Sequence, residues 1–174
     1  MRGDPVKLSA SDIDVIAAGA GPLAVLVHSS VSGARQWRRL VEVLSTTHRV
    51  LAPNLYGYGR TPAWQAPPAQ AITDQSALVR AVIPDDATGI TLVGHSFGAT
   101  IAMQVAAELG ARVTRLVLVE PNPFMLLQQH GRDEAFAEPI MLRNVVKTHG
   151  ARGDWQGAAE RFTHYWTGPG AWAA

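Results

Sequence analysis

The chain has 174 residues, of which 47% are hydrophobic and 17% charged, and its formal net charge is +1. This length allows one domain with a sizeable core, and no run of like charge marks a surface for nucleic acid or an anionic membrane. The lack of cysteine excludes disulfides and thiolate metal sites. The first twelve residues lack the apolar core of a signal peptide, and no segment is long enough to span a bilayer. We therefore expect a cytoplasmic protein with no nucleic-acid or membrane partner.

Short aliphatic runs along the first 120 residues predict five strands. They lie at residues 14–19, 23–28, 49–53, 90–94 and 113–120. Helical patterns lie between them, at residues 37–44, 74–82 and 101–109, and Gly110 closes the last one. Strands that alternate with helices favour an α/β fold, with a mostly parallel sheet covered by helices on both faces.

Residues 121–174 follow a different, helical pattern that contains no further strand. Pro139 is expected to open one helix, which ends before Gly150. Asp154 is expected to cap another helix, which stops at residues 168–170. The sequence therefore predicts a sheet-containing part, residues 1–120, and a helical part, residues 121–174.

The segment Gly94-His95-Ser96-Phe97-Gly98 joins a strand to a helix with almost no room to reverse direction. Ser96 must therefore adopt a strained backbone conformation, and the two glycines remove side chains that would clash. The turn pushes the serine oxygen clear of the backbone, beside the free N–H groups of a helix N-terminus. This is the G-x-S-x-G nucleophile elbow, and it predicts that Ser96 is a nucleophile.

With this motif the sequence resembles the serine-nucleophile branch of the α/β-hydrolase superfamily over nearly its whole length. Residues 26–37 occupy the place of the oxyanion loop after the family's third strand, and residues 52–64 resemble the loop after the fourth. Residues 116–124 look like the sixth strand running into a cap domain. The resemblance implies a core with strands 1–6 over residues 1–120 and a partial helical cap or lid over residues 121–174, with the chain truncated inside the cap.

Two residues depart from the family pattern. Ser29 stands where the oxyanion loop usually has glycine, and we expect it to tighten the oxyanion pocket. Tyr58 stands where the later loop often has histidine, and we expect this change to affect only packing.

The family pattern also implies the partners of Ser96. The backbone N–H groups of Ser30 and Phe97 are the expected donors to the oxyanion. Glu120 ends the sixth strand, where some branches, haloalkane dehalogenases among them, place the acid of the triad. Glu120 is either this acid or a strand-end carboxylate that shapes the pocket or the cap hinge, and the sequence leaves both interpretations open.

The catalytic base is not evident in these residues, because it should follow an eighth strand that the chain does not have. We expect His28 to brace the oxyanion loop and the His95 side chain to point away from Ser96 into the sheet surroundings. The other four histidines lie at the wrong edge of the sheet or in the helical part, where a surface or packing role is expected: His48, His130, His149 and His164.

The resemblance implies a serine hydrolase that forms an acyl-enzyme with a small, apolar ester, lactone or related carbonyl substrate, without a metal or organic cofactor. The alternative is a non-catalytic binding or interaction protein of the same fold, which the missing base favours. A sheet that ends at the sixth strand exposes an apolar edge. We expect a missing C-terminal segment or a second copy in a homodimer to cover this edge, and little ester turnover by the 174 residues alone.

Overall fold

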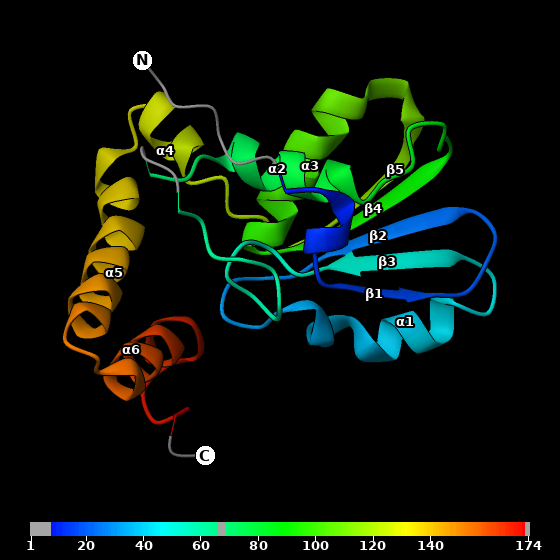
Figure 1. The fold of residues 1–174 in the computed structure, drawn as a ribbon. Coiled ribbons are helices and arrows are strands. Elements are labelled where there is room, and N and C mark those ends of the chain that lie inside the picture. The colour runs from blue at the N-terminus through cyan, green and yellow to red at the C-terminus, as the bar shows by residue number, and fades with distance from the viewer. Residues whose placement is uncertain (1–7, 66–68, 173–174) are drawn as a thin grey trace. The chain divides into compact units, whose positions relative to one another are not determined.

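The computed structural model describes residues 8–65 and 69–172, which form two compact units (Figure 1). The first unit ends at Asn122 and contains the sheet, and the second begins at Pro123 and is helical. A role of the second unit as a cap stays a prediction. No described helix combines the length and the apolar character needed to cross a membrane.

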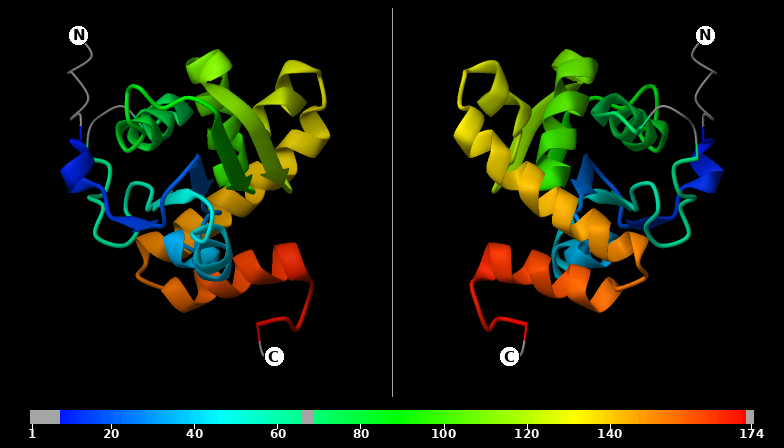
Figure 2. Two further views of the ribbon diagram at one scale, coloured as in Figure 1. Left: turned by 90° about the vertical axis from the view of Figure 1, so that its right-hand side faces the viewer. Right: turned by 90° about the vertical axis from the view of Figure 1, so that its left-hand side faces the viewer.

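The first unit is built on a five-stranded sheet with the order β1-β3-β2-β4-β5. The strands are β1 (Val15–Ala18), β2 (Leu23–Val27), β3 (Arg49–Pro53), β4 (Ile90–His95) and β5 (Val113–Val119). β1 pairs antiparallel with β3, and all other neighbours are parallel. The sheet twists, so that β1 and β5 run in clearly different directions in Figure 2. The predicted α/β fold is confirmed. The described residues contain five of the six strands that the family resemblance implies, and residues 1–7 lie outside the described part.

Helices cover both faces of the sheet, with α1 opposite α2 and α3 (Figure 1). Their bounds are α1 (Arg38–Leu44), α2 (Ile72–Ala81) and α3 (Phe97–Leu109), with short 3-10 turns at Ala10–Asp12, Ala34–Trp37 and Gly110–Arg112. Because successive side chains of a strand point to opposite faces, β2 contributes side chains to the hydrophobic clusters on both faces of the sheet. Val25 and Val27 pack in the cluster that includes α2 and α3, whereas Leu26 packs in the cluster with Trp37 of the α1 layer.

The outer strand β5 differs from the buried central strands. Leu116, Val117 and Val119 are 39%, 47% and 43% exposed. β5 pairs only with β4 among the described residues, so its other edge has no partner strand there. Apolar side chains on an unpaired edge are a surface that proteins normally cover.

The described part of the second unit, up to residue 172, contains three helices, α4 (Met125–Gln129), α5 (Asp133–Ala151) and α6 (Trp155–Thr167). The prediction that Pro139 opens a helix was wrong, because α5 begins six residues earlier and Pro139 lies inside it. The first turn carries Asp133 and Glu134, which favour a helix start through the helix dipole. Asp154 caps α6 as predicted, since its Oδ1 accepts from the Gly157 N–H at 2.9 Å.

Candidate active site

Ser96 occupies a strained turn between β4 and α3. It is the N-cap residue of α3, with φ 54° and ψ −119°, a conformation that non-glycine residues seldom adopt. A Cβ at Gly94 would lie 2.5 Å from the Ala99 Cα, and one at Gly98 would collide with the Val27 and His28 carbonyl oxygens. The helix therefore approaches β4 at Gly94 and the end of β2 at Gly98 so closely that a side chain at either position would clash, as the sequence predicts for the two glycines.

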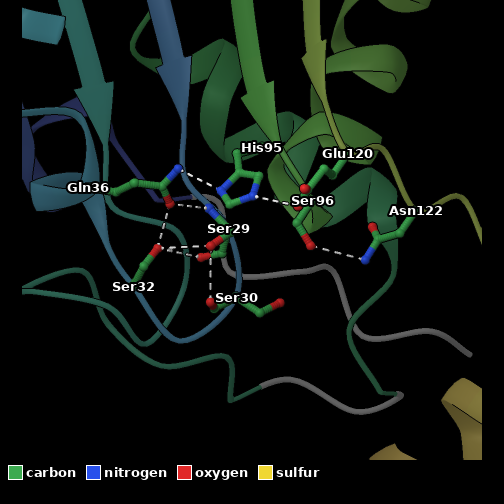
Figure 3. A network of polar contacts seen from close by, with 8 residues as sticks. All are labelled: Ser29, Ser30, Ser32, Gln36, His95, Ser96, Glu120 and Asn122. Atoms are coloured by element: carbon green, nitrogen blue, oxygen red, sulfur yellow. Dashed lines mark hydrogen bonds and ion pairs between the residues drawn. The ribbon is translucent and has the colours of Figure 1, made fainter. Parts of the chain in front are cut away.

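The Ser96 hydroxyl has a partner that sequence reasoning missed. Asn122 Nδ2 donates to Ser96 Oγ at 3.2 Å, and Thr100 Oγ1 lies 3.1 Å from Asn122 Oδ1 (Figure 3). The available signal was an amide residue between two prolines directly after a strand at the elbow's edge of the sheet.

The N–H groups of the two expected oxyanion donors have no hydrogen-bond partner among the described residues. Phe97 is the first residue of α3, and the first N–H groups of a helix have no partner within it. Ser30 lies in the loop after β2, and its N–H forms no hydrogen bond with any residue that the structure describes. Their role as donors stays a prediction.

His28 holds the oxyanion loop to the loop after β3. Its ring is fully buried, and Nε2 accepts from the Leu55 N–H at 3.1 Å. Because a backbone N–H can only donate, the ring proton is on Nδ1, which donates to the Ser29 carbonyl oxygen at 2.7 Å. Burial lowers the pKa of His28, so the ring is held in its neutral form. His28 braces the loop as expected and is not placed to serve as a base.

Tyr58 also holds this loop, so the expectation that it affects only packing was wrong. Its hydroxyl oxygen accepts from the Val31 N–H at 2.9 Å, and its ring meets His28 edge-on with 4.6 Å between centroids. Val31 has φ 55°, a strained conformation for a β-branched residue. The Ser29 hydroxyl lies within the same loop, 3.1 Å from Ser32 Oγ.

Gln36, His95 and Glu120 form a polar chain along the carboxyl edge of the sheet (Figure 3). Gln36 Nε2 lies 2.8 Å from His95 Nδ1, and His95 Nε2 lies 3.4 Å from Glu120 Oε2. The expectation that the His95 side chain points into the sheet surroundings was wrong, because an amide and a carboxylate offer its two ring nitrogens polar partners at this edge. Glu120 has φ 47° and a side chain that is 83% exposed, and its role as the acid of the triad stays a prediction.

The structure does not place a base beside Ser96 within the described part of the first unit. No histidine there forms a hydrogen bond with Ser96, and His48 is paired with Thr47. In the second unit, His149 Nδ1 lies 2.7 Å from Asp154 Oδ2, and this contact lowers the pKa of Asp154. Among the described residues no three His, Asp or Glu side chains gather as a metal site would require.

The mostly parallel sheet, the elbow at Ser96 and the loop after β2 together define an α/β hydrolase fold. The family model described as "Alpha/beta hydrolase family" matches residues 24–174, and the chain belongs to this family.

Similar proteins in the family act on different substrates. The chain is 36% identical over 104 residues to Lipase LipV of Mycobacterium tuberculosis, covering 59% of this chain and 38% of the lipase. It is 35% identical over 114 residues to 2-hydroxy-6-oxo-2,4-heptadienoate hydrolase of Pseudomonas putida, covering 58% of this chain and 38% of that enzyme. These matches span only about two-fifths of the length of either relative.

Solved structures show the same fold. The thioesterase domain from the curacin biosynthetic pathway superimposes with a TM-score of 0.57 at 28% identity, covering 63% of this chain and 42% of that domain. The Bacillus megaterium epoxide hydrolase superimposes with a TM-score of 0.63 at 23% identity, covering 74% and 47%. At this identity the second likeness concerns the fold alone.

Proposed function

We propose that this chain is part of a serine hydrolase that cleaves a small, apolar ester, lactone or related carbonyl compound through an acyl-enzyme. One observation carries the proposal: Ser96 stands at a strained turn, with φ 54°, at the N-terminus of α3. Strain of this kind is maintained where it positions a reacting group. Phe97 directly follows, its N–H has no partner among the described residues, and negative charge is favoured there.

In the proposed reaction Ser96 Oγ attacks the carbonyl carbon of the substrate, and a base accepts the hydroxyl proton. The carbonyl oxygen becomes an oxyanion, to which the Phe97 and Ser30 N–H groups donate. Collapse of this intermediate expels the alcohol, which takes up the proton and leaves an acyl group on Ser96. Water then attacks the acyl group, releases the acid and returns the proton to Ser96.

The proposed base is a histidine that the first unit does not supply. Glu120 is the candidate acid that would orient it, because its side chain is largely exposed and only Oε2 has a partner, His95, among the described residues. The contact with His95 is also the observation that supports the other role of Glu120, that of a carboxylate that shapes the edge of the site.

The nucleophile and the relatives support the proposed substrate class. A serine nucleophile suits carbonyl substrates, whereas the epoxide hydrolases of this superfamily use aspartate at the elbow. The lipase, thioesterase and dienoate hydrolase names all point to carbonyl chemistry in the proteins that bear them. The exposed Met125, Leu126 and Trp166 of the second unit would suit an apolar substrate if this unit acts as a cap.

A fluorophosphonate probe tests the nucleophile directly. We expect the complete gene product to be labelled at Ser96, and Ser96→Ala to abolish the labelling. Ser45→Ala, a serine at the exposed end of α1, is the matched control and should leave it intact. A folded gene product that the probe does not label would overturn the proposed hydrolase.

The second candidate function is a binding or interaction protein that keeps the fold without catalysis. The observation in its favour is that no histidine forms a hydrogen bond with Ser96 within the described first unit. The same labelling experiment separates the two candidates, because a binding protein without a base would not react with the probe at a useful rate.

A further inference from the structure

We propose that Gln36 is a positioning residue that locks the oxyanion loop to the nucleophile elbow by holding His95 as a neutral ring with its proton on Nε2. The inference rests on the proposed function and adds a residue to the same site. It comes from three contacts of one amide side chain, which Figure 3 shows between the loop after β2 and the end of β4.

The first step fixes the orientation of the Gln36 amide. The Ser29 N–H lies 3.0 Å from Gln36 Oε1, and a backbone N–H can only donate, so the atom that faces it must be the oxygen. The Ser32 hydroxyl lies 2.7 Å from the same oxygen and can donate to it as well. The amide nitrogen is therefore the atom directed at His95.

The second step fixes the proton of His95. Gln36 Nε2 lies 2.8 Å from His95 Nδ1, and an amide nitrogen only donates, so Nδ1 must accept and carries no proton. In the neutral ring the proton is then on Nε2, which faces Glu120 Oε2 at 3.4 Å. With a proton on Nδ1, the ring N–H and the Gln36 amide N–H would be two donors facing each other. Rotation of the amide by 180° would remove this conflict but would break the hydrogen bond from the Ser29 N–H.

The third step connects this lock to the chemistry. Ser29 precedes Ser30, the expected oxyanion donor, and His95 precedes Ser96, the proposed nucleophile. Gln36 itself is anchored by its neighbour Trp37, which is buried in the α1 layer. The Gln36 side chain thus joins Ser29, which precedes the expected donor, to His95, which precedes the nucleophile. This link keeps the distance between donor and nucleophile fixed, which an oxyanion site requires because donors act only at about 3 Å from the developing charge.

Nuclear magnetic resonance of histidine-labelled protein tests the lock without catalysis. In the complete gene product we expect the His95 nitrogen shifts of an Nε2-protonated neutral ring, with the signals assigned by their loss in His95→Gln. In Gln36→Glu, the carboxylate still accepts from the Ser29 N–H but also presents an acceptor to Nδ1. We therefore expect the His95 proton to move to Nδ1 or the ring to become an imidazolium.

Two results would overturn the inference: a wild-type His95 with its proton on Nδ1, or a Gln36→Glu protein whose His95 signals are unchanged. The wild-type measurement tests the position of the His95 proton even if the Gln36→Glu variant fails to fold.

Turnover by the complete gene product tests the consequence for catalysis. Gln36→Leu removes all three contacts, and we expect kcat to fall about 10- to 100-fold with little change in KM, the size of effect that misplaced reacting groups produce. Gln104→Leu, on the body of α3, is the matched control.

Equal kcat in both variants would refute the positioning role of Gln36, while labelling of Ser96 would still support the hydrolase. Absent labelling would refute the hydrolase but leave the His95 proton position intact.

Discussion

Backbone strain at single residues is concentrated at one edge of the sheet. Three non-glycine residues of the described chain have positive φ: Val31 at 55°, Ser96 at 54° and Glu120 at 47°. Each follows the carboxyl end of a parallel strand, β2, β4 or β5 in turn. Such conformations cost on the order of 1–3 kcal/mol each and persist where the surrounding structure enforces them. The edge that carries the proposed nucleophile therefore stores conformational free energy that the core must offset.

Val31 offers a direct measurement of this strain. Its side chain is 69% exposed, so Val31→Gly removes little packing, keeps the N–H that donates to Tyr58 and relieves the positive φ. We expect the free energy of unfolding to rise by about 1 kcal/mol, reduced in part by the greater backbone entropy of glycine. Urea unfolding of the two proteins checks this.

A matched control for Val31→Gly comes from α1. Val43 is 66% exposed but lies inside this helix, so Val43→Gly should lower stability by a few tenths of a kcal/mol through helix propensity. If Val31→Gly destabilises the protein as much as Val43→Gly does, the loop at Val31 is not strained in solution.

At the scale of elements, the sequence predicts those features that depend on the pattern of neighbouring residues. All five strands of the described sheet follow from aliphatic runs, and the elbow follows from glycines at two positions around Ser96. The start of α5 did not follow, because the rule that proline begins helices is only a tendency and Pro139 lies within α5.

The contacts of the site depend instead on loops that meet from distant parts of the chain. Gln36 and His95 are 59 residues apart, and Val31 and Tyr58 are 27 apart. No local periodicity encodes these pairs, so the partners of the predicted residues became visible only in the fold. Asn122 escaped prediction for the same reason, since its link to Ser96 spans 26 residues.

His28 shows how one buried side chain links two elements and makes stability depend on pH. Burial lowers its pKa in the folded protein from the ordinary value of 6.5, so the folded state keeps the ring neutral where the unfolded state binds a proton. Through the protonation of His28, stability is therefore independent of pH above about 6.5 and falls as the pH drops below it. One such proton contributes a slope of at most about 1.4 kcal/mol per pH unit.

Replacing this ring tests the linkage. We expect His28→Gln to be less stable than the wild type at pH 7.5, because the Leu55 N–H contact is disturbed, yet to lose less stability between pH 6.5 and 5. Urea titrations at a series of pH values measure both slopes, and His48→Gln, at an exposed turn before β3, controls for the loss of an ordinary histidine. Equal slopes for wild type and His28→Gln would show that His28 is protonated in the folded protein.

At the scale of the whole molecule, the edge of the sheet at β5 exposes apolar side chains and has no partner strand among the described residues. Central strands of the sheet are buried on both faces, as parallel strands normally are, whereas β5 leaves Leu116, Val117 and Val119 partly exposed. Each of these side chains would gain free energy from burial at about 25 cal/mol per Å² of apolar surface. We expect this edge to be covered in solution by a further segment of the gene product or by a second copy of the chain.

Association of the 174-residue chain tests cover by a second copy. We expect light scattering to give a mass that rises with concentration from monomer to dimer or beyond. Val117→Lys should lower that mass, because a lysine on an exposed strand edge opposes pairing. Val43→Lys, on the exposed side of α1, adds the same charge away from the edge and should not. A chain that stays monomeric at high concentration, with β5 amides that exchange freely with deuterium, would mean that this edge needs no cover.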